Sequence, residues 1–81
     1  MFDIDKLVER EAPKDDEHDK EYAKELRSAY ERLKDHSFSD LKVEQRIYNR
    51  NYRFHGATHH NTATLMVIYE LLKTVRKENE L

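Results

Sequence analysis

The chain has 81 residues, of which 40% are charged and 37% are hydrophobic, and its formal net charge is −2. This length suits one small domain with a modest core, and the near-neutral charge excludes a protein that binds polyanions with its whole surface. The absence of cysteine excludes disulfides and thiolate metal sites, and we expect a cytoplasmic protein. A single glycine and a single proline leave few turn residues for a sheet, so an all-α fold is favoured.

The first helix is expected at residues 2–10, either as a short helix or as a docking arm. One side of this segment is apolar and consists of Phe2, Ile4, Leu7 and Val8. The helix must end before Pro13, because the residue preceding a proline is disfavoured in the α conformation. A frayed terminus is the alternative.

The second helix is expected at residues 15–35. Its apolar residues recur at the spacing of a helix with one buried face: Tyr22, Leu26, Ala29, Tyr30 and Leu33. Its first turns carry several acidic residues, where the helix dipole favours negative charge: Asp15, Asp16, Glu17 and Asp19.

The third helix is expected at residues 40–55, with Ser39 or Asp40 as its N-cap and Gly56 directly after its end. Residues 48–54 also partly alternate between polar and apolar, as a strand does. The one-sided distribution of basic residues favours the helix.

A basic stripe is the most informative feature of this third segment. At 100° per residue, its basic residues and one asparagine gather on one face: Lys42, Arg46, Asn49, Arg50 and Arg53. Its apolar residues fall on the other side: Val43, Ile47, Tyr48, Tyr52 and Phe54. Residues 1–40 hold 8 basic and 13 acidic side chains, a net charge of −5, whereas residues 41–81 hold 7 and 4, a net charge of +3.

The fourth helix is expected at residues 59–77 and is the most apolar segment. One stripe consists of Leu65, Ile68, Leu72 and Val75, but Met66, Val67, Tyr69 and Leu71 leave little of its first half polar. A helix that is apolar nearly all round must be buried nearly all round. Either it lies at the centre of a compact bundle, or a homodimer covers it.

Three interpretations of the basic stripe follow from its chemistry. Its arginines pair with the acidic residues of the second helix, or they bind an acidic surface of a partner protein, or they contact nucleic-acid phosphates. In the nucleic-acid case Tyr48 and Tyr52 stack on bases, and His59 and His60 extend the surface.

Other classes of function lack the necessary residues. A helix-turn-helix around Gly56 fails, because Asn51, His55 and Thr62 stand where apolar residues are needed. The histidines at 55, 59 and 60 do not have the spacing of a zinc site, so no metal or cofactor is expected. No phosphate-binding glycine loop or nucleophile motif occurs, so no enzyme is expected.

The sequence therefore predicts a single all-α domain, residues 1–81, of three or four helices, possibly completed by homodimerisation. Its predicted role is that of a non-catalytic regulatory module in which the basic stripe meets an acidic partner surface. The alternative is a small regulator that binds DNA or RNA with the same stripe. No apolar run reaches the length of a membrane span, so no membrane partner is expected.

Overall fold

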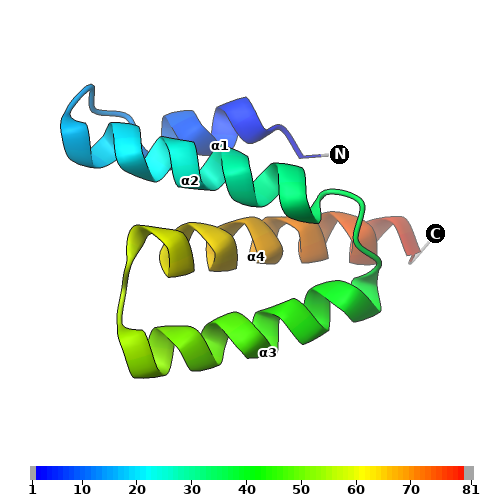
Figure 1. Ribbon diagram of the computed structural model, residues 1–81. Coiled ribbons are helices and arrows are strands. Elements are labelled where there is room, and N and C mark those ends of the chain that lie inside the picture. The colour runs from blue at the N-terminus through cyan, green and yellow to red at the C-terminus, as the bar shows by residue number, and fades with distance from the viewer. Residues whose placement is uncertain (1, 80–81) are drawn as a thin grey trace.

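A computed structural model describes the backbone of residues 2–79 and the side chains of residues 2–75. Within that range the chain forms four helices and no strand (Figure 1). They are α1 (Ile4–Glu11), α2 (Glu17–Leu33), α3 (Phe38–His55) and α4 (His59–Asn79). The all-α prediction is confirmed, and residues 48–54, which partly alternate like a strand, belong to α3.

Short polar side chains fix where the helices begin. Asp3 and Asp16 cap α1 and α2 by accepting hydrogen bonds from backbone N–H groups one turn on. Ser37 caps α3, because its Oγ accepts the backbone N–H of Asp40 at 3.1 Å. The prediction that Ser39 or Asp40 fills this position is wrong, because the helix already begins at Phe38. Thr58 serves α4 in the same way, with its Oγ1 3.1 Å from the backbone nitrogen of Asn61.

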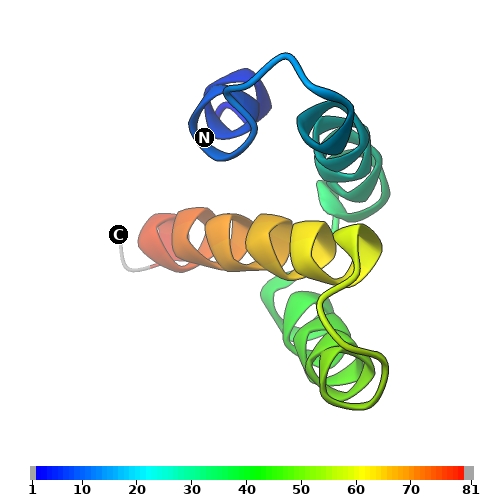
Figure 2. The same cartoon turned by 90° about the vertical axis from the view of Figure 1, so that its left-hand side faces the viewer.

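Helix α4 lies at the centre of the fold (Figures 1 and 2). It packs against α2 on one side and against α3 on the other, and α1 packs against α2. No other helix pair packs to a comparable extent within residues 2–79. The core consists of buried residues from all four helices: Leu7, Leu26, Ala29, Leu33, Leu41, Ala63, Val67, Ile68, Leu71 and Leu72.

The apolar surface of α4 is thus covered largely within one chain. Of the stripe expected from the sequence, Ile68 and Leu72 are buried, whereas Leu65 and Val75 are half-buried. The structure measures 41 × 29 × 16 Å along its principal axes, so it is flat, with a shortest dimension less than half of the longest. One side of α4 therefore stays open, and the side chain of Tyr69 on that side is exposed.

Buried polar side chains within the described part of the chain all have hydrogen-bond partners. Thr64 is fully buried in α4, and its Oγ1 accepts a hydrogen bond from Arg32 of α2 at 3.2 Å. Asn61 donates to the backbone carbonyl of Gly56 at 3.3 Å, which ties the start of α4 to the end of α3. Among these residues, no helix combines the length and the hydropathy needed to span a membrane.

Candidate functional site

Helix α3 has one face that the rest of the described chain leaves uncovered. It lies at the edge of the fold and contacts α4 through the side that carries the fully buried Leu41 and the half-buried Tyr48 (Figure 1). The opposite side points away from the core. We call it the outer face of α3 and define it by seven exposed residues: Lys42, Val43, Arg46, Ile47, Arg50, Arg53 and Phe54.

The basic residues of the outer face have no carboxylate partner within the described part of the chain. The ion pairs found there involve none of the basic residues of α3. On α2, Glu25 contacts His60 and Glu31 pairs with Lys34. Pairing between the basic stripe and α2 therefore does not occur here, because α4 lies between α2 and α3 (Figure 2).

Four polar residues expected to act together do lie together. Arg46, Asn49, Arg50 and Arg53 line one shallow depression, and the ring of Phe54 completes it. Lys42 lies outside this depression, and its Nζ is 5.8 Å from the ring centroid of Phe38 at the start of α3.

The outer face also exposes three large apolar side chains, which the sequence had placed on a separate, apolar side of the helix. Val43 and Ile47 are each 47% exposed, and Phe54 is 73% exposed. On the helical wheel these three residues lie beside Arg50 and about 140° from Tyr48 and Tyr52. Hence only the tyrosine side of the apolar set faces α4, and the other three residues share a surface with the arginines.

Tyr48 and His60 do not belong to the basic surface. The Tyr48 hydroxyl accepts a hydrogen bond from Arg32 at 3.2 Å and lies 3.3 Å from Nε2 of His60. The other ring nitrogen of His60, Nδ1, lies 3.1 Å from a carboxylate oxygen of Glu25. These side chains join α2, α3 and α4 to one another, because His60 stands in the first turn of α4, between the other two helices.

His59 and Tyr52 lie elsewhere as well. The His59 ring is half-buried and packs edge-on against His18, with 4.6 Å between the ring centroids. Tyr52 lines a groove of about 560 Å³ along the open side of α4, together with Leu65, Met66 and Tyr69. The residues predicted to form one partner surface are therefore divided among the outer face of α3, this groove and the helix junctions.

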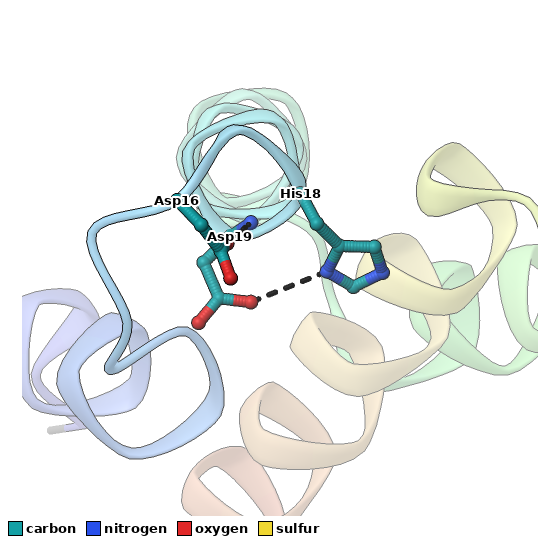
Figure 3. A group of neighbouring side chains, drawn as sticks. All are labelled: Asp16, His18 and Asp19. Carbon is teal, nitrogen blue, oxygen red and sulfur yellow. Dashed lines mark hydrogen bonds and ion pairs between the residues drawn. The ribbon is translucent and has the colours of Figure 1, made fainter.

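Among the described residues, one cluster of potential metal ligands occurs at the start of α2, where Asp16, His18 and Asp19 bring ligand atoms within 4.8 Å of one another (Figure 3). Its carboxylates already accept hydrogen bonds from the chain. Asp16 accepts the backbone N–H of Asp19 at 2.8 Å, and Asp19 accepts that of Lys14 at 2.7 Å. This bond from Lys14, followed by the contact with His18, lowers the pKa of Asp19 below its usual value of 3.8. The cluster is thus accounted for by the start of the helix.

Comparison with known proteins adds no functional assignment to this description. No family model, no curated protein and no solved structure matches the chain, so the outer face of α3 has to be interpreted from its own chemistry.

Proposed function

We propose that this chain is a non-catalytic protein-interaction module that binds an acidic surface of a partner protein through the outer face of α3. The observation that carries the proposal is that one helix face combines three exposed apolar side chains with three arginines that have no carboxylate partner among the described residues. Arginine and large apolar residues are the types that supply much of the binding free energy at protein interfaces.

The apolar residues favour a protein over a nucleic acid as the partner. Phosphate contacts reward positive charge, but they do not bury aliphatic side chains such as Val43 and Ile47. Of the two residues expected to stack on bases, Tyr48 is engaged with Arg32 and His60, and Tyr52 lies in the groove along α4 rather than on the outer face. Phe54 is the one aromatic ring on the outer face.

We further propose that the chain can self-associate and that it is cytoplasmic. Self-association through α4 has less support than the composition of that helix suggests, because Ile68 and Leu72 are already buried within one chain, in which α4 packs against α2 and α3. A second chain would have to pack against the open side of α4, where Tyr69 is exposed and Leu65 is half-buried. A cytoplasmic location is supported by the absence of cysteine.

Site-specific photo-crosslinking in the cells that naturally make the chain tests the proposed function. A photoreactive amino acid replaces Ile47 on the outer face or, as the matched control, the exposed Ser28 on α2. We expect a nuclease-resistant protein adduct from position 47 that is absent from position 28. The adduct should disappear when Arg46 and Arg50 are changed to glutamate. An adduct that nuclease destroys, or equal labelling from the two positions, would refute the proposal.

A further inference from the structure

Three exposed apolar side chains and one arginine of α3 follow a line along the helix axis. Val43, Ile47, Arg50 and Phe54 are separated by four, three and four residues. This is the alternation of the a and d positions in a heptad repeat, which keeps a row of side chains facing one partner helix. At 1.5 Å per residue the row is about 17 Å long, or about three helical turns. Its geometry suits a second helix laid along it.

The charge beside this row lies mostly on one flank. Arg46 and Arg53 are seven residues apart and occupy equivalent g positions of the heptad. The opposite flank carries Glu44 and Asn51 at the e positions. Residues at e and g select the partner in helix pairs, because each meets a charged residue of the other helix.

A second copy of the chain is a poor occupant of this face. If two α3 helices paired antiparallel, Arg46 of one copy would meet Arg53 of the other across the g flank. If they paired in parallel, the two copies of Arg50 would meet within the apolar row. Either arrangement brings like charges together at the interface. Their repulsion disfavours association of two copies, although apolar surface would be buried.

We propose that the occupant is an acidic amphipathic helix of a partner protein. Its apolar residues pack against Val43, Ile47 and Phe54, and its carboxylates pair with Arg46, Arg50 and Arg53. This inference rests on the proposed function and makes it more specific, since it names the secondary structure and the charge pattern of the partner surface.

A synthetic peptide of roughly three heptads is the probe, with Leu at positions a and d and Glu at e and g. Its binding to the full chain is measured by titration calorimetry at low salt. Two control peptides isolate the two contributions: one replaces every Glu with Lys, and the other keeps Glu but replaces every Leu with Ser. We expect the acidic Leu peptide to bind in the micromolar range and each control at least about tenfold more weakly.

Variants of the chain locate the binding. The pair Arg46→Glu and Arg53→Glu should weaken binding of the acidic peptide at least about tenfold and strengthen binding of the Lys peptide. Phe54→Ser should weaken the binding of the acidic peptide and of the Lys peptide alike, because both peptides carry Leu at positions a and d. Lys24→Glu is the matched control, because Lys24 is exposed on α2, away from α3, and should leave binding unchanged. All of these side chains are exposed, so the variants are expected to keep the circular dichroism and melting temperature of the parent.

Three results overturn the acidic-helix proposal. The first is equal binding of the acidic and Lys peptides. The second is undiminished binding of the Ser peptide, which would mean that the face recognises charge alone. The third is displacement of the peptide by duplex DNA or by anionic lipid vesicles at lower concentration. If the peptide fails while position 47 still crosslinks to a protein, the acidic-helix inference is wrong and the proposed function stands.

Discussion

The central position of α4 leads to a quantitative prediction about two isoleucines. Ile68 on α4 is fully buried in the core, whereas Ile47 on α3 is 47% exposed. Replacement of a buried isoleucine by valine removes one methylene group and leaves a small cavity, at a cost of about 1 kcal/mol. The same replacement at an exposed position changes the free energy of unfolding by less than about 0.5 kcal/mol.

The corresponding melting temperatures follow from the size of the chain. For 81 residues, the entropy of unfolding near 60 °C is about 170 cal/mol/K. A loss of 1 kcal/mol therefore lowers the melting temperature by about 6 °C. We expect this shift for Ile68→Val and a shift below about 3 °C for Ile47→Val.

Thermal unfolding followed by circular dichroism at 222 nm measures both values, at low and at high micromolar protein concentration. Equal shifts for the two variants at the low concentration would refute the placement of Ile47 on an uncovered face. Equal shifts that appear only at the high concentration would instead show that a second chain covers Ile47. That result would also contradict our argument against self-pairing of α3.

Three further predictions concern the helix ends. Ser37→Ala removes the cap of α3 and should cost about 1 kcal/mol in urea unfolding, whereas Ser39→Ala should cost much less; equal costs would contradict the assignment. Gly56→Ala should destabilise by about 1–3 kcal/mol although an added Cβ meets nothing within 4 Å, because Gly56 has φ 84° and ψ −171°; a neutral result would mean that this turn relaxes. The folded-state pKa of Asp19 is depressed, so its carboxylate stabilises the fold above pH 3.8 and loses this effect as the pH falls through the lower value. Urea unfolding between pH 2 and 7 should therefore show a weaker loss of stability in acid for Asp19→Asn than for the parent, and identical pH profiles would contradict this role.

The fold class could be predicted because helical periodicity and caps are local properties. The stripe from Tyr22 to Leu33 identifies the buried side of α2, where Leu26, Ala29 and Leu33 are buried. The sequence alone allowed α4 to be buried either at the centre of one chain or in a homodimer. Its composition shows that the helix must be covered, but not whether its own chain or a second chain covers it. The structure places α2 and α3 on its two sides.

The candidate site was predictable only in part. Helical spacing was sufficient to group Arg46, Asn49, Arg50 and Arg53, which line one depression. It did not separate Val43, Ile47 and Phe54 from the two tyrosines, although their wheel angles differ by about 140°. Nor did it place His60 beside Glu25, because this contact joins residues 35 positions apart and depends on how α4 crosses α2.

Helix α3 packs mainly against α4 and reaches α2 only through the hydrogen bond between Tyr48 and Arg32, and this determines how the molecule opens. When α3 detaches, mainly its interface with α4 is lost. When α4 detaches, its interfaces with both α2 and α3 are lost and the core residues become exposed. Amide protons of α3 therefore exchange with solvent through a partial opening that requires less free energy than global unfolding. If a partner helix binds the outer face as proposed, it adds a further interface to α3, and we expect it to suppress this opening. We therefore expect partner binding to slow amide exchange within α3 before it affects other helices. The exchange rates of α4 report on the stability of the whole fold.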